Sequence, residues 1–151
     1  MESTPIPEIF DNLPLVLVWM PLGALGEELG WRGYLHKKLD ERVNGLLSSL
    51  LVGMLWTLFH VHFLAQGFVF VFFFALVLVS QSVVLYAFIR STGFSVLLAT
   101  IFHWAFNLIN LTILDVIYET TYMMVSGIVW AIVAAAVVFM KQDLFLHRRT
   151  N

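Results

Sequence analysis

The chain has 151 residues, of which 60% are hydrophobic and 12% are charged, and its mean hydropathy is +0.89. This composition excludes an ordinary soluble globular protein and is typical of a membrane protein. The net charge of −2 gives no basic surface for nucleic acid, so no nucleic-acid partner is predicted. The absence of cysteine excludes disulfides, thiolate metal sites and cysteine nucleophiles.

The N-terminal part of the chain is predicted to hold one membrane segment with polar neighbours. Residues 1–12 are polar and form a predicted tail. Residues 13–26 are apolar but shorter than the ~20 residues that a membrane span needs. The first helix therefore reaches full length only if it includes residues 27–32. Residues 34–44 are polar and basic, and their apolar positions repeat every four residues, which predicts a short helix at the membrane interface.

Four further apolar segments are long enough to be membrane spans, namely residues 43–63, 67–89, 92–114 and 122–140. The first of these four carries small residues at four-residue spacing, which permit close helix contact: Gly45, Ser49 and Gly53. The segment 67–89 is rich in phenylalanine and nearly all apolar, so we expect it to face lipid.

Together these segments predict an all-α fold, a polytopic membrane helix bundle of about five transmembrane helices. A single membrane-embedded domain is predicted over residues 13–140, followed by a basic cytoplasmic tail over residues 141–151. His36 and His147 lie in basic polar segments, so both are predicted to be solvated.

With five spans, the eight lysines and arginines all fall on one side of the membrane. The positive-inside rule then places the N-terminus outside and the C-terminus in the cytoplasm. The N-terminus lacks the basic region of a secretory signal, and the short chain favours a prokaryotic cell membrane.

Two adjacent carboxylates and an arginine, Glu27, Glu28 and Arg32, follow the first apolar run. Charges at membrane depth are costly and point to function. On a helix, Glu28 and Arg32 lie four residues apart on one face and can pair. Glu27 is rotated by about 100° from Glu28, so the arginine neutralises it less directly. The alternative is that both acids lie at the water interface and only hold the helix end.

Two later segments carry polar pairs at four-residue spacing, Trp56 with His60 and His103 with Asn107. Lipid cannot satisfy such groups, so they must face protein or trapped water. One alternative is hydrogen bonding between helices, which is common in membrane bundles. Because three segments each offer a titratable group, a shared site is favoured. Helical periodicity turns His62 to a different face from His60.

The polar groups suit hydrolysis of an amide without a covalent intermediate. A carboxylate and an imidazole, from Glu27 and His60, can remove a proton from an attacking water. His103 and Asn107 can donate hydrogen bonds to the developing oxyanion, each worth ~3 kcal/mol in a dry site. Two histidines and one glutamate, His60, His103 and Glu27, are also a known catalytic zinc set. The absence of a His-Glu-x-x-His helix weakens the zinc interpretation.

The three segments converge only if the second span is unusual. A straight helix that enters near residue 43 raises His60 by roughly 25 Å, whereas His103 lies roughly 16 Å from the start of its own segment. The site therefore closes only if the second span starts below the membrane surface, tilts strongly or ends early, and residues 37–44 are predicted to project into the cytoplasm. A separation above ~10 Å between His60 and Glu27 would contradict the site, because hydrogen bonds reach only ~3 Å.

The three motifs together resemble the signature of the CPBP family, which comprises CAAX-prenyl-protease-like and bacteriocin-processing (Abi) intramembrane endopeptidases. The residues that carry the resemblance are Glu27-Glu28-x-x-x-Arg32, Trp56-x-x-x-His60 and His103-x-x-x-Asn107. The similarity spans roughly residues 13–114. The supporting residue Trp56 stands where the family usually has phenylalanine.

This resemblance implies that Glu27 activates water with the help of His60, while His103 and Asn107 bind the oxyanion. It also implies that Glu28 and Arg32 organise the site. The implied enzyme is a glutamic-type intramembrane protease without a cofactor, and zinc dependence is the minor alternative. Relatives usually carry further membrane helices, so a partner chain or a homo-oligomer is a further expectation.

The predicted function is cleavage of a membrane-associated peptide or protein tail within the lipid bilayer. The resemblance leaves both CAAX-type processing and bacteriocin self-immunity open. The alternative from another class is a non-catalytic membrane protein, either an immunity or peptide-binding factor or a proton-coupled transporter that uses Glu27 and His103 as relay groups.

Overall fold

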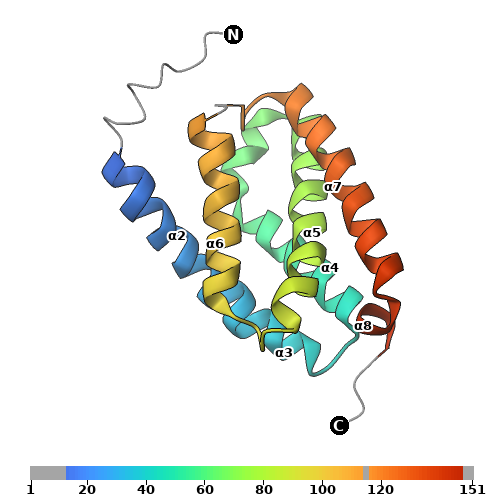
Figure 1. Cartoon of the computed structure of the whole chain (residues 1–151). Helices are drawn as coiled ribbons and strands as arrows, with labels where there is room; N and C mark the ends of the chain where they lie inside the picture. Colours follow the sequence, from blue (N-terminus) through green and yellow to red (C-terminus); the bar gives the residue numbers. More distant parts are fainter. Residues whose placement is uncertain (1–12, 114–115, 148–151) are drawn as a thin grey trace.

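A computed structural model describes residues 13–113 and 116–147 of the chain (Figure 1). The predicted N-terminal tail over residues 1–12 lies outside the described residues. Every regular element in the described ranges is helical. In chain order they are η1 (Leu15–Trp19), α2 (Met20–Glu28), η2 (Leu29–His36), α3 (Lys37–Asp40), α4 (Gly45–Phe59), η3 (Val61–Gln66), α5 (Phe68–Arg90), α6 (Val96–Asn107), η4 (Leu108–Ile113), α7 (Thr120–Met140) and α8 (Gln142–Leu146).

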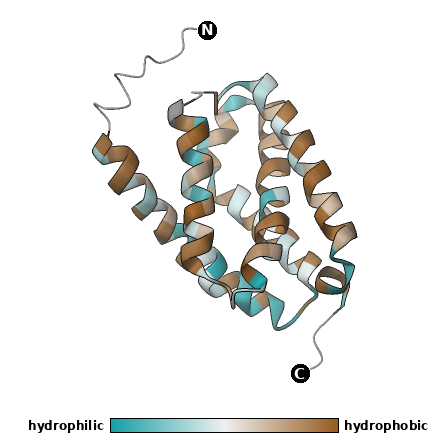
Figure 2. Ribbon diagram, viewed as in Figure 1, coloured by the Kyte–Doolittle hydropathy of each residue, from teal (hydrophilic) through white to brown (hydrophobic). Residues whose placement is uncertain are grey.

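These helices pack as a bundle, which confirms the predicted all-α fold. α5 contacts α4 and α7, and α2 packs against α6. α5 and α7 are long and apolar enough to cross a membrane, whereas α4 and α6 are apolar but shorter. Figure 1 shows that α2 begins at one end of the bundle and α7 finishes at the other. In Figure 2 hydrophobic residues dominate the helices, and hydrophilic segments gather around α3 and α8.

The first helical rod is longer than the sequence predicts. It runs from η1 through α2 and η2 to α3, because the residues at each junction keep helical backbone angles. Residues 34–44 are therefore not a separate interfacial helix. His36, which was predicted to be solvated, is fully buried and stacks on Tyr86 with ring centroids 5.1 Å apart. Continuation of the helix carries this histidine into the core.

α5 is a core helix, so the prediction that it faces lipid is wrong. Phe70 and Phe74 are buried, while Phe68 and Phe72 on the same helix are exposed. A helix that is apolar on every side has no face that the sequence can assign to lipid, and such helices are commonly buried. Here α4 and α7 cover α5 from two sides.

The small-residue stripe of α4 brings this helix close to α5, as predicted. A Cβ atom placed on Gly53 would lie 2.5 Å from the Cα of Val79, which is a backbone atom of α5. A Cβ atom on Gly45 would meet the ring of Tyr86 at the same distance. Only glycine permits these contacts, so the stripe sets how closely α4 approaches α5.

Replacement of Gly53 by alanine is therefore expected to lower the free energy of unfolding by about 1–3 kcal/mol, because overpacking forces the helices apart. Thermal unfolding in detergent micelles measures this change. Gly23 is the matched control, since a Cβ atom there meets no heavy atom within 4 Å. Gly23→Ala should stabilise the helix by about 0.5–1 kcal/mol. Equal effects of the two variants would contradict the close approach.

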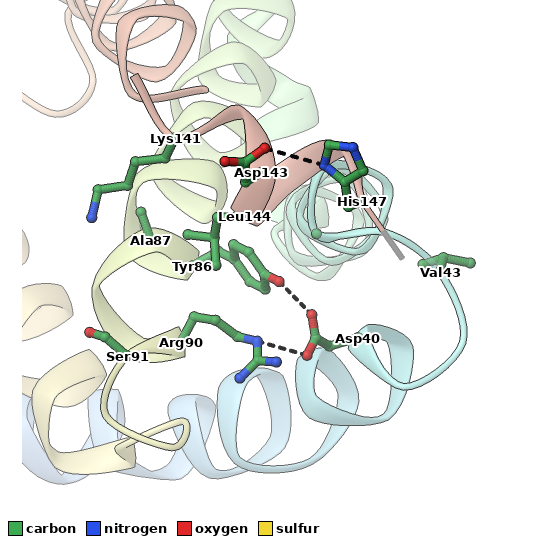
Figure 3. Close-up of a pocket in the computed structure, with 11 residues that line it drawn as sticks. Asp40, Val43, Tyr86, Ala87, Arg90, Ser91, Lys141, Asp143, Leu144 and His147 are labelled. Carbon is green, nitrogen blue, oxygen red and sulfur yellow. Dashed lines mark hydrogen bonds and ion pairs between the residues drawn. The ribbon is translucent and has the colours of Figure 1, made fainter. Parts of the chain in front are cut away.

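A polar cluster ties the end of the bundle together beside a cavity of about 470 Å³ (Figure 3). Asp40 of α3 accepts a hydrogen bond from the Tyr86 hydroxyl and pairs with Arg90 at 2.9 Å. Phe145 of α8 is fully buried, and its ring centroid lies 5.3 Å from that of Tyr86. The first residues of the predicted tail 141–151 therefore belong to the bundle, because Phe145 is apolar enough to join its core. His147 is exposed, as predicted.

Candidate active site

A cavity of about 190 Å³ lies inside the bundle between α2, α4, α5 and α6. It gathers all four residues that the sequence predicts to be catalytic, which are Glu27, His60, His103 and Asn107. The supporting residue Trp56 lines the same cavity. Phe63 and Phe74 also line it, and both belong to one apolar cluster with Trp56. The polar groups therefore share one space that an apolar wall surrounds.

Trp56 connects two of these residues. Its indole Nε1–H donates a hydrogen bond of 2.8 Å to Oε2 of Glu27. Its backbone carbonyl lies 2.9 Å from Nδ1 of His60. A carbonyl oxygen can only accept, so Nδ1 of His60 carries the proton and Nε2 keeps a lone pair when the ring is neutral. One tryptophan thus orients the carboxylate and the imidazole together.

A buried ion pair supports the other side of the cavity. Nη1 of Arg32 donates a hydrogen bond of 2.8 Å to Oε1 of Glu28, and both side chains are fully buried. This confirms the pairing expected from their four-residue spacing. The same Glu28 oxygen lies 2.9 Å from Nδ1 of His103. The guanidinium of Arg32 also covers the Trp56 ring at 4.2 Å from its centroid.

The end and the path of α4 match what the segments need in order to converge. α4 ends at Phe59 because His60 leaves the helical region, with φ −90° and ψ 44°. Figure 1 shows α4 crossing the bundle obliquely. An early end of this helix is one of the three alternatives under which the sequence analysis expects the three segments to converge. Glu27 and His60 both contact Trp56, so they are brought together rather than scattered across the bilayer.

The sequence analysis missed three polar residues of the cavity wall. His62 was expected on another face, but it lines the cavity, and its ring centroid lies 5.7 Å from that of His60. The 3-10 helix η3 begins at Val61, so α-helical periodicity no longer applies there. Gln81 and Tyr118 also line the cavity. A single amide within the apolar run of α5 was the available signal for Gln81.

A zinc site would need at least three metal-binding side chains close together. Within residues 13–113 and 116–147, no three histidine, cysteine, aspartate or glutamate side chains are arranged to hold a metal ion. Glu27, His60 and His103 line one cavity without forming such a set. Zinc dependence therefore stays the minor alternative, and the absence of any cofactor stays a prediction.

The family model described as type II CAAX prenyl endopeptidase, Rce1-like, matches residues 9–109, which include all three motifs. The chain belongs to this family. The match confirms the resemblance that the motifs indicate. The Rce1-like family is membrane-embedded, in agreement with the apolar helices α5 and α7.

A curated relative of this Rce1-like chain is CAAX prenyl protease 2 from Methanococcus maripaludis. The two proteins are 29% identical over 146 residues, which cover 89% of this chain and 53% of the relative. The chain thus spans about half the length of the relative that it matches.

Proposed function

We propose that this chain is an intramembrane endopeptidase that hydrolyses a peptide bond of a membrane-associated CAAX-type substrate by activating water with Glu27. The single observation that carries the proposal is the shared cavity of Glu27, His60, His103 and Asn107. Membership in the Rce1-like family supports the reaction class and the substrate class.

Glu27 is the proposed general base. Trp56 donates a hydrogen bond of 2.8 Å to the Oε2 atom of Glu27, which gives the carboxylate a defined orientation. The Oε1 atom of Glu27 is then the proposed contact of the water molecule. His60 is the proposed assistant, because its Nε2 atom can accept a hydrogen bond from the same water. Positioned bases of this kind contribute about 10²–10⁴-fold to a rate.

His103 and Asn107 are the proposed donors to the oxyanion. Because Nδ1 of His103 donates to the carboxylate of Glu28, its Nε2 atom can donate only when the ring is an imidazolium. Glu28 orients the His103 ring through this contact, and Arg32 fixes the carboxylate in place. The amide of Asn107 supplies the second donor.

The proposed reaction then balances without a metal ion. Water adds to the scissile carbonyl carbon as its proton moves to Glu27, and the carbonyl oxygen becomes an oxyanion beside His103 and Asn107. The intermediate collapses with breakage of the carbon–nitrogen bond. Glu27 returns the proton to the leaving amine, which restores the carboxylate.

Reconstitution of the chain in lipid vesicles with a quenched fluorogenic peptide that ends in a prenylated CAAX sequence tests this function. We expect cleavage at one peptide bond, and we expect the rate to be unchanged after treatment with a zinc chelator. Loss of activity with the chelator, restored by zinc, would contradict water activation by the carboxylate. Binding of the peptide without cleavage would contradict the enzyme and favour a non-catalytic peptide-binding protein.

A further inference from the structure

Gln81 is a buried amide that the proposed reaction leaves unused. It lies within α5, in an apolar stretch, and its side chain lines the cavity that holds Glu27 and His103. The residue is 1% exposed, and its Nε2 atom has no hydrogen-bond partner among the described residues. Burial of an amide donor without a partner is unfavourable, so such a group in a functional cavity calls for an explanation.

The chemistry of a primary amide matches that of a peptide group. Its NH₂ group donates and its carbonyl oxygen accepts, whereas a peptide group offers one acceptor and one donor. A side-chain amide can therefore form two hydrogen bonds with the N–H and the C=O of one extended residue of the substrate, which belong to adjacent peptide groups because the N–H and C=O of a single trans peptide group point in opposite directions. Such recognition reads the backbone of a substrate and tolerates different side chains. No charge is needed, which suits a cavity with an apolar wall.

Four other polar groups of the cavity have proposed roles around the reacting carbonyl. Glu27 and His60 face the attacking water, and His103 and Asn107 face the oxyanion, under the proposed function. Gln81 comes from α5, whereas Glu27 comes from α2, His103 and Asn107 come from α6, and His60 directly follows α4. Its amide is thus available for the chain of the substrate beyond the scissile carbonyl.

We propose that Gln81 is a substrate-binding residue, which holds a main-chain peptide group of the substrate beside the scissile bond. The inference rests on the proposed function and adds a binding contact to it. It also accounts for the amide donor that lacks a partner inside the protein, because the substrate supplies the acceptor. A merely structural glutamine would instead bond to neighbouring helices.

The test compares Gln81→Met, which keeps the length of the side chain but removes both hydrogen-bonding groups, with the wild-type chain. On the fluorogenic prenylated CAAX peptide, we expect kcat/KM to fall about tenfold, since one or two neutral hydrogen bonds are lost. The unfolding temperature should stay the same or rise, because the buried Nε2 atom has no hydrogen bond among the described residues to lose. Gln81→Leu is a second variant for the same measurement.

Ser82 provides a matched control one residue further along α5. It is fully buried and its hydroxyl also lacks a partner, but it does not line the cavity. Ser82→Ala should leave kcat/KM unchanged. Binding of the same peptide is also measured in the Glu27→Gln background, where Gln81→Met should weaken the affinity about tenfold without any cleavage.

The outcomes separate this inference from the proposed function. If the wild-type chain is active and both Gln81 variants keep its kcat/KM and its affinity for the peptide, the substrate contact is overturned and the proposed function stands. A lower unfolding temperature with unchanged affinity would also overturn it, because that result indicates a structural role. If the wild-type chain binds the peptide but does not cleave it, the proposed enzyme activity is overturned. Weaker binding by Gln81→Met would in that case still support the substrate contact.

Discussion

Replacement of Glu27 by glutamine is expected to lower kcat for the prenylated CAAX peptide by about 10³-fold or more, because the general base is lost. Glu27 supplies the only carboxylate among the described residues that line the cavity. Glutamine keeps an oxygen that can accept the hydrogen bond from Trp56, so the fold should persist. Initial rates in lipid vesicles measure the effect, and thermal unfolding checks that the protein is intact.

The matched control is Glu41→Gln, which makes the same chemical change at a half-exposed glutamate paired with Lys38. This variant should retain the wild-type rate. Activity of Glu27→Gln within a few fold of the wild type would contradict the role of Glu27 as the base. A large loss in both variants would instead indicate a general sensitivity to loss of charge.

Replacement of Arg32 by methionine is expected to lower the free energy of unfolding by about 3–5 kcal/mol, since the buried carboxylate of Glu28 loses its guanidinium partner. Arg32 and Glu28 are both fully buried and their charged atoms are 2.8 Å apart. Denaturation in mixed micelles measures the change. Addition of Glu28→Gln to Arg32→Met should recover much of the loss, because the unpaired charge is then removed.

The exposed pair of Lys38 and Glu41 is the control for this cycle. Its atoms are 3.0 Å apart, but both side chains are about half exposed. Lys38→Met should therefore change stability by less than about 1 kcal/mol. An equally small effect of Arg32→Met, or no recovery in the double variant, would contradict a buried ion pair that organises the site.

Local patterns predicted the helical bundle and several contacts within it correctly. Apolar length indicated the helical membrane bundle, and the spacing of the three motifs indicated which polar residues share a cavity. The pairing of Glu28 with Arg32 followed from helix periodicity alone. The small-residue stripe around Gly53 correctly predicted close contact with another helix. These predictions succeed for two reasons. The residues of each motif lie within one helix, where spacing defines the face they share, and a small residue such as glycine permits another helix to come close.

The interpretations that failed depend on where a helix ends and on what covers it. His62 reaches the cavity because α4 stops at His60, and no strong breaker residue marks that point. His36 is buried because the helical rod continues to Asp40, which places the His36 ring against that of Tyr86. α5 lies in the core because α4 and α7 cover it, although its apolar sequence suits lipid equally well.

The sequence by itself determined the class of fold, the family motifs and the types of group available for chemistry, since these depend on composition and on spacing along single helices. Only the tertiary structure decided that Trp56 orients Glu27 and that Glu28 holds His103. It also brought Gln81 to the cavity wall. The physical reason is that periodicity defines the faces of one helix, whereas the crossing of helices and the points where they end decide which faces meet.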